Sequence, residues 1–162
     1  MTPEQIHQKL AAAGFRIEYE VSPPDPHLKV PREEVGAVAQ ILSTDPELAF
    51  DSLMCLSGLD WPDHLQVVYH LHSFRHNHKV TLKVICPKDD PTVPTVCRIW
   101  PTADWHEREA FDLIGVRFEG HPDLRRLLLP EDWEGHPLRK DYTPPAFWHD
   151  IPVTVQSPEP AK

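Results

Sequence analysis

LMCLSGLDWPDHLQVVYHLHSFRHNHKVTLKVICP, residues 53–87, is the part of the sequence with the clearest strand pattern. Three apolar runs, residues 53–60, 64–74 and 79–87, are separated by two short polar turns. In the third run valine and leucine alternate with lysine and threonine, which is the period of a strand with one covered face. Strands joined by short turns pair antiparallel. The stretch therefore predicts an antiparallel sheet.

The rest of the sequence predicts helices and short strands around this sheet. Apolar residues recur at helical spacing in several segments, and glycine or proline ends most of them. Helices that flank consecutive antiparallel strands form a two-layer α+β domain, with a mainly antiparallel sheet packed against helices. The predicted helices are residues 3–13, 31–44, about 93–100 and about 104–114, and the additional strands are residues 15–21 and 28–30.

The sequence divides into three predicted parts. Residues 1–115 form the α+β domain, residues 116–142 an extended docking segment with little regular structure, and residues 143–162 a proline-rich tail. Proline fits poorly into helices and central strands, so the tail is either a disordered end or a strap laid along a partner. The aromatic side chains of Phe147 and Trp148 favour the strap.

Residues 104–142, DWHEREAFDLIGVRFEGHPDLRRLLLPEDWEGHPLRKDY, mix charges of both signs with many large apolar side chains. On a helical wheel of residues 104–114 the apolar groups lie nearly all round, so some carboxylates must enter a poorly hydrated environment. We expect Glu107 and Glu109 to be buried and paired with arginines of this chain or with basic residues of a neighbouring subunit, and Arg108 to reach Asp112 at i,i+4. A solvated charged helix with scattered aromatics is the alternative.

Three runs in this segment carry a family resemblance: ERE at 107–109, FDLIGV at 111–116 and GHPDLRRLLLPEDWEGHPLRKDY at 120–142. Together they resemble the signature of the C-type subunit of NADH-quinone oxidoreductase, the 30 kDa subunit family of respiratory complex I. One departure is Thr143-Pro144-Pro145, where the family continues with Pro-Leu. No domain resembling the quinone-site subunit follows, so we expect the unfused form.

The resemblance implies a cofactor-free scaffold subunit of the peripheral arm of a complex I-type enzyme. This enzyme passes electrons from NADH to quinone and couples the transfer to proton translocation. NADH, FMN, the iron–sulfur clusters and quinone would belong to other subunits. The implied neighbours are the D-like quinone-site subunit, the B-like terminal iron–sulfur cluster subunit and other peripheral-arm subunits. The implied location is peripheral, on the cytoplasmic side of the cell membrane.

The predicted partner interface combines the charged helix, the two Gly-His-Pro turns at 120–122 and 135–137 with the basic pair after each, and the aromatic residues of the tail. The turns are either docking prongs or ordinary turns, and for His121 and His136 we favour a structural hydrogen-bonding role. The predicted interface residues are Glu107, Arg108, Glu109, Asp112, His121, Arg125, Arg126, Trp133, His136, Arg139, Lys140, Tyr142, Phe147 and Trp148.

Two alternatives stay open. The first is the equivalent subunit of a related membrane-bound hydrogenase, or of a ferredoxin- or F420-linked quinone reductase. The second is a free-standing metal-binding module, because His70, His72, His76 and His78 flank a predicted hairpin turn and imidazole binds zinc, copper and nickel. A metal site needs three or four converging ligands with support behind them, so a solvated turn is favoured and no metal ligand is assigned.

Composition excludes several function classes. The net charge of −9 argues against nucleic acid as a partner. No run of 18 apolar residues and no signal peptide is present, and a reduced cytosolic compartment suits three cysteines without a CxxC pair. These cysteines cannot supply the four ligands of an all-cysteine iron–sulfur cluster, and no glycine-rich nucleotide loop occurs. No residue is assigned a catalytic role.

Overall fold

The computed structural model describes residues 1–23 and 25–153 and contains one five-stranded sheet in the order β1-β2-β5-β4-β3. The three long strands pair antiparallel as predicted, and the short β2 runs parallel to β5. The mainly antiparallel α+β fold is therefore confirmed. The strands of this sheet are β1 Glu18–Glu20, β2 His27–Lys29, β3 Ser52–Asp60, β4 His64–Ser73 and β5 His78–Pro87.

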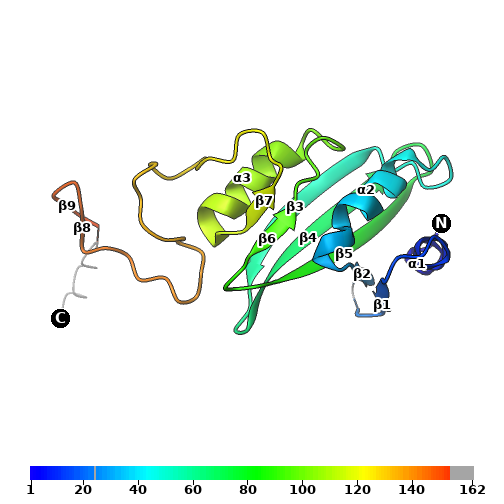
Figure 1. Ribbon diagram of the computed structural model, residues 1–162, viewed down its shortest axis with the longest axis horizontal. Helices are drawn as coiled ribbons and strands as arrows, with labels where there is room; N and C mark the ends of the chain where they lie inside the picture. Colours follow the sequence, from blue (N-terminus) through cyan, green and yellow to red (C-terminus); the bar gives the residue numbers. More distant parts are fainter. Residues whose placement is uncertain (24, 154–162) are drawn as a thin grey trace, which may run out of the picture.

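Helices cover one face of the sheet. In Figure 1, α2 and α3 lie in front of the strands, while α1 lies beside β1 and β2. The alternating leucines and valines of β4 and β5 point to this covered face and are almost fully buried. The buried residues of the first two helices are Ile6 and Leu10 of α1 and Val35, Val38, Ala39 and Leu42 of α2. The helical elements are α1 Pro3–Ala12, the 3-10 turn η1 Arg32–Glu34, α2 Val35–Thr44 and α3 Ala103–Ile114.

The predicted helix at about residues 93–100 is wrong. The strand β6, Thr92–Pro94, occupies its beginning and pairs in parallel with β7, Arg117–Glu119. Only a turn follows, in which the N–H groups of Ile99 and Trp100 donate to the carbonyl of Val96. Pro94 breaks the helical pattern, and pairing with a distant strand outweighs local preference.

The packed domain also extends beyond residue 115, the boundary predicted from the sequence. Val116 and Phe118 are buried in the common core, and β7 carries the chain back beside β6. From residue 120 the chain leaves the sheet as a long projection, which we call the arm, residues 120–153 (Figure 1). The proline-rich part of the arm contains one small hairpin, β8 Phe147–Trp148 with β9 Ile151–Pro152.

Residues 154–162 of the predicted tail lie outside the described residues. Within the described part of the chain, none of the helices combines the length and the apolar character that a bilayer crossing requires.

Candidate functional site

Asp112 in the last turn of α3 organises the start of the arm. Its buried carboxylate accepts a hydrogen bond from Arg126 Nη1 at 2.7 Å. The other oxygen accepts from the backbone N–H groups of Leu127, Leu128 and Leu129 at 3.0, 2.7 and 2.9 Å. Burial by itself raises the pKa of Asp112, but these four donors outweigh it and the pKa is lowered. The arm therefore begins on an ionised buried carboxylate.

The carbonyl groups at the C-terminal end of α3 receive donors from further along the arm. His136 Nδ1 lies 2.9 Å from the carbonyl oxygen of Asp112, and Arg139 Nε donates to the carbonyl of Ile114 at 2.7 Å. The last carbonyls of a helix have no partner inside the helix, so such donors satisfy groups that would otherwise need water. The structural role expected for His136 agrees with this contact.

Gly115 and Arg126 determine how closely the arm returns to the helix. Arg126 Nη2 donates to the carbonyls of Trp133 and Gly135 at 2.7 and 3.0 Å. Gly115 ends α3 with φ of 85°, and a Cβ atom at this position would lie 2.6 Å from the His136 ring. Glycine is required here by both the left-handed backbone and the close approach of the ring.

Glu107 is fully buried, as predicted, but its partners are not arginines. One carboxylate oxygen accepts from the N–H of Val96 at 2.8 Å, and the other accepts a short hydrogen bond from the Thr95 hydroxyl. Burial raises the pKa of Glu107 from 4.5 to about 7, against the opposing effect of these two donors. Burial within this chain is wrong for Glu109: its side chain is exposed, because it lies on the opposite side of α3. Pairing of Glu109 with a basic residue of a neighbouring subunit stays a prediction.

The expected ion pair between Arg108 and Asp112 does not form. Arg108 is buried, its guanidinium donates to the carbonyls of Arg125 and Arg126, and its Cζ lies 5.2 Å from the centre of the Trp105 ring. Asp112 is already saturated by donors from the arm, so Arg108 supports the backbone of the arm instead.

Cys97, Glu107 and His121 bring three possible metal ligands within 4.8 Å of one another. His121 Nδ1, however, accepts a hydrogen bond from the N–H of Asp123 at 3.0 Å. In a neutral imidazole the proton is then on Nε2, the nitrogen that faces Glu107 at 3.9 Å. A protonated nitrogen offers no lone pair to a metal ion, so the arrangement is that of a hydrogen-bonded cluster.

The histidine hairpin directs its rings to separate partners. His76 Nε2 lies 2.8 Å from the carbonyl oxygen of Pro46, and the buried His78 Nε2 lies 2.7 Å from that of Leu48. Within residues 1–23 and 25–153, the hairpin histidines are not part of a group of three close metal ligands. Its geometry lends no support to a metal-binding module.

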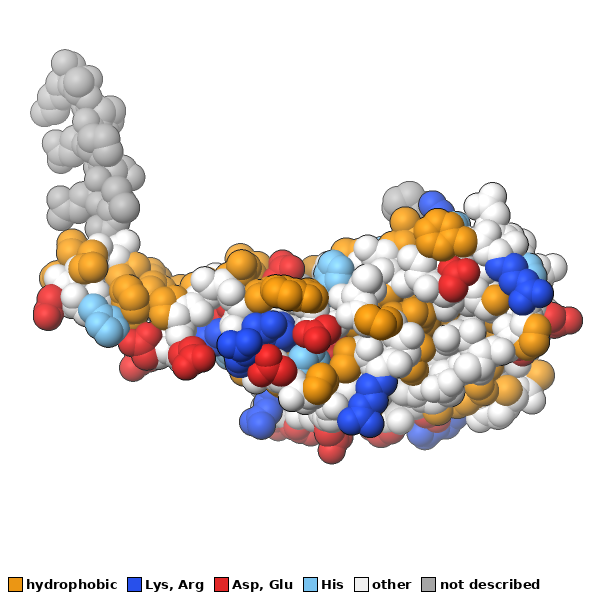
Figure 2. All heavy atoms as spheres, turned by 90° about the horizontal axis from the view of Figure 1, so that it is seen from above, with side chains coloured by type: hydrophobic (Ala, Val, Ile, Leu, Met, Phe, Trp, Pro, Cys, Tyr) orange, Lys and Arg blue, Asp and Glu red, His pale blue; other side chains and the backbone are white. Residues whose placement is uncertain are grey.

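Trp133, Tyr142 and Trp148 of the arm contact one another, whereas Phe147 does not share in these contacts. Trp133 Nε1 donates to the Tyr142 hydroxyl at 3.0 Å, and the Trp133 and Trp148 rings lie 5.9 Å apart. The Lys140 N–H donates to Asp60 at the end of β3 and ties the arm to the sheet. Phe147 is 65% exposed. Figure 2 shows apolar side chains along the arm and charges of both signs where it joins the domain.

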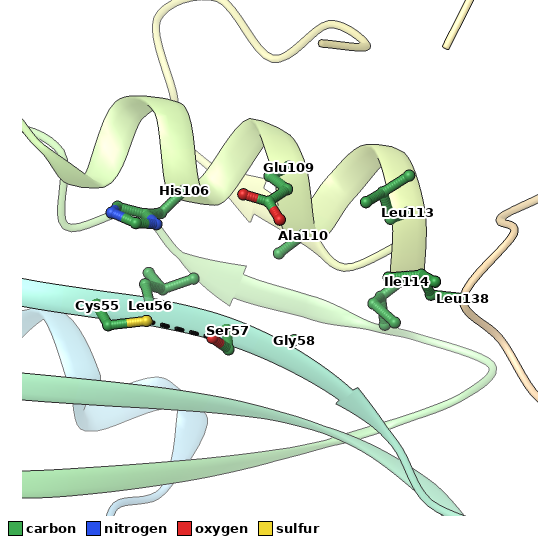
Figure 3. Close-up of a pocket in the computed structure, with 10 residues that line it drawn as sticks. All are labelled: Cys55, Leu56, Ser57, Gly58, His106, Glu109, Ala110, Leu113, Ile114 and Leu138. Atoms are coloured by element: carbon green, nitrogen blue, oxygen red, sulfur yellow. Dashed lines mark hydrogen bonds between the residues drawn. The ribbon is translucent and has the colours of Figure 1, made fainter. Parts of the chain in front are cut away.

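A groove of about 290 Å³ lies between α3 and β3 (Figure 3). His106, Glu109 and Leu113 of α3 form one wall, residues 55–58 of β3 form the other, and Leu138 of the arm lies at one end. No described residue forms an ion pair with Glu109. This groove was not predicted from the sequence, although the spacing 106, 109, 113 indicates a helical stripe.

The sequence matches a known family. The sequence model described as respiratory-chain NADH dehydrogenase, 30 Kd subunit, matches residues 28–147. The chain belongs to this family. It is 53% identical over 119 residues to the C-type NADH-quinone oxidoreductase subunit of Chloroherpeton thalassium, which covers 72% of this chain and 50% of that protein. The corresponding subunit of Chlorobium phaeobacteroides is 48% identical over 119 residues and 72% of each chain.

Two solved structures also resemble this member of the 30 kDa subunit family. A trypsin-resistant fragment of Nqo5 has a TM-score of 0.61 and 31% identity, over 76% of this chain and 100% of the fragment. A chain of the membrane-bound sulfane sulfur reductase, an archaeal respiratory membrane complex, has a TM-score of 0.72 and 26% identity, over 86% and 85% of the two chains. The chain spans about half the length of several of the curated relatives it matches.

A pH dependence follows from Glu107. Its pKa is about 7 in the folded chain and near 4.5 when exposed, so its contribution to stability is present at low pH and is lost as the pH rises through this window. We expect the wild type to lose about 2 kcal/mol of unfolding free energy between pH 5 and 7 from this group. Glu107→Gln, which resembles the protonated form, should lose correspondingly less in urea unfolding.

Glu109→Gln is the matched control for this measurement, because it removes an exposed carboxylate two residues away. Its pH dependence should follow the wild type. Parallel curves for the wild type and Glu107→Gln would contradict a proton held by Glu107.

Proposed function

We propose that this chain is a cofactor-free scaffold subunit in the peripheral arm of a complex I-type NADH-quinone oxidoreductase. Its role is to support electron transfer from NADH to quinone, coupled to proton translocation, by holding neighbouring subunits in place. The neighbours are the quinone-site and terminal iron–sulfur cluster subunits, on the cytoplasmic side of the membrane. Relatives named as subunits of NADH-quinone oxidoreductase support this assignment.

The observation that carries the proposal is the arm. It projects from the domain yet is anchored to α3 through the buried carboxylate of Asp112. Four of its large apolar side chains are 60% or more exposed. Exposed apolar groups on an anchored projection are typical of a surface that another protein covers. The exposed apolar residues of the arm are Leu128, Leu138, Phe147 and Ile151.

A second candidate is the equivalent subunit of a membrane-bound respiratory complex with a different electron donor or acceptor. The likeness to a chain of the membrane-bound sulfane sulfur reductase favours it. The scaffold role is the same in both cases, and the difference lies in the subunits that accompany the chain.

Purification of the tagged chain from detergent-solubilised membranes of its host tests the proposal. We expect it to bring down a complex that contains flavin and iron–sulfur clusters and oxidises NADH with quinone. A complex without NADH oxidation would support the second candidate. A chain recovered alone from the membranes would contradict both.

The chain purified by itself should show only aromatic absorption in the ultraviolet and visible range.

The arm supplies a more specific prediction. Phe147→Ala should reduce incorporation into the complex about tenfold when it competes with wild-type chain carrying a different tag, because an aromatic anchor at an interface contributes strongly to binding. Phe74→Ala is the control, since Phe74 is 73% exposed but lies at the β4–β5 turn, away from the arm. Equal incorporation of both variants would contradict a docking role for the tail.

A further inference from the structure

The long strand β3 has a free edge. It pairs with β4 on one side, and on the other side it is the last strand of the sheet. Apart from the Thr102 hydroxyl, which donates to the carbonyl of Leu53 at 3.4 Å, no described residue outside the sheet hydrogen-bonds to the backbone of residues 53–60. A nine-residue edge strand with open backbone groups is a template for another strand.

The strand β3 carries few of the features that normally protect a free edge from pairing with another strand. Its sequence, SLMCLSGLD, contains neither lysine nor proline, and its side chains Met54 and Leu59 are exposed. Its β-bulge lies between Leu53 and Cys55, so the bulge disturbs only the beginning of the strand. The regular part that remains free is the same part that lines the groove beside α3.

The groove restricts what can lie along this edge. It is bounded by the backbone of residues 55–58 on one side and by α3 on the other, so a narrow extended chain fits it better than a helix (Figure 3). The α3 wall contributes one carboxylate, Glu109, next to His106 and the apolar side chain of Leu113. A carboxylate without an ion pair in an otherwise largely apolar groove favours a cationic side chain with a long aliphatic stem.

We propose that an extended segment of a neighbouring subunit adds as a strand to the free edge of β3 and places a lysine or arginine opposite Glu109. This inference rests on the proposed function, because it requires a complex, and it names the chemistry of one contact in that complex. Main-chain hydrogen bonds would supply affinity, and the pair with Glu109 would set the register of the added strand.

Hydrogen exchange resolved to single amides tests strand addition. Rates are compared between the isolated full-length chain and the same chain in the purified complex. Alternate amides within residues 55–59 should exchange at least tenfold more slowly in the complex, because each gains an inter-strand hydrogen bond. The opposite edge strand, β1, is the internal control and should not change. Unchanged exchange at residues 55–59 in an intact complex would overturn the inference.

Competition for assembly tests the charge. Wild-type chain and Glu109→Gln, with different tags, are expressed together, and we expect the variant to be about tenfold under-represented in the complex, as loss of a charge-assisted hydrogen bond implies. Glu18→Gln, an exposed carboxylate on β1, should be incorporated equally. Circular dichroism and urea unfolding of isolated Glu109→Gln should match the wild type. Incorporation of Glu109→Gln equal to that of the wild type would overturn the proposal that a lysine or arginine of the partner pairs with Glu109.

Sedimentation of the isolated chain addresses the other possible occupant. If the isolated chain sediments as a dimer and its amides 55–59 are already protected from hydrogen exchange, a second copy pairs with β3. This result would overturn the proposed partner. Failure of the wild-type chain to purify with other subunits would contradict the proposed function and this inference together. An intact complex with an unprotected β3 edge would contradict this inference alone.

Discussion

Replacement of Asp112 by alanine is expected to lower the free energy of unfolding by about 3–5 kcal/mol, the range found when one member of a buried ion pair is removed. The carboxylate is fully buried and serves Arg126 and three consecutive backbone N–H groups. Its removal leaves the poorly hydrated Arg126 guanidinium without its counter-ion and three amides without an acceptor. Urea unfolding at pH 7 measures the change, and Asp112→Asn, which keeps an acceptor oxygen but loses the charge, should fall between wild type and alanine.

Asp123→Ala is the matched control, because Asp123 also pairs with an arginine of the same segment. Arg125 Nε donates to it at 2.9 Å, but both side chains are more than half exposed. Water replaces this contact, so the unfolding free energy should stay within the error of measurement. Similar losses in Asp112→Ala and Asp123→Ala would contradict the view that the buried carboxylate holds the arm in place.

The long strands and α3 could be predicted from the sequence because their signals are local. Alternating valine and leucine marks β5, and Gly115 marks the end of α3. The hydrogen bonds of the site could not be predicted in the same way. Asp112 meets amides that are fifteen to seventeen residues away, in a segment without regular structure. Nothing in the spacing of one element specifies where a distant backbone will present its N–H groups.

The two glutamates of α3 show what a helical wheel can and cannot predict. Glu107 lies on the stripe of Ala103, Ala110 and Ile114, which packs on the sheet, and so its burial follows from helix geometry. Glu109 lies on another side and faces the groove. The wheel shows that apolar groups surround both residues, but only the position of the sheet decides which carboxylate is buried.

Each basic pair that follows a Gly-His-Pro turn is divided between two environments. Arg126 and Arg139 turn inward to the end of α3, while Arg125 and Lys140 remain exposed. The two interpretations of these turns, docking prongs or ordinary turns, therefore apply to different members of each pair. The inward member secures the arm, and the outward member is the one available to a partner. Partner contacts by Arg125 and Lys140 stay predictions.

Gly115→Ala should lower the free energy of unfolding by about 2–5 kcal/mol, as the sum of a left-handed backbone penalty and an overpacked contact. The added Cβ would lie 2.6 Å from the His136 ring, which is held by its hydrogen bond to the carbonyl of Asp112. The ring must move, and the end of α3 then loses one of its donors. Thermal or urea unfolding of the isolated chain measures the effect.

Gly14→Ala separates the two contributions. Gly14 has φ of 95°, close to that of Gly115, but a Cβ there would meet nothing within 4 Å. Its substitution should therefore cost only the backbone term, about 1–2 kcal/mol. If the two variants lose the same free energy of unfolding, the His136 ring moves aside without a measurable loss of stability. The close approach of the arm to Gly115 would then not contribute to holding the arm on α3. If Gly115→Ala loses clearly more, the arm is locked onto α3 by steric fit as well as by charge, and its exposed apolar residues are presented from a fixed position.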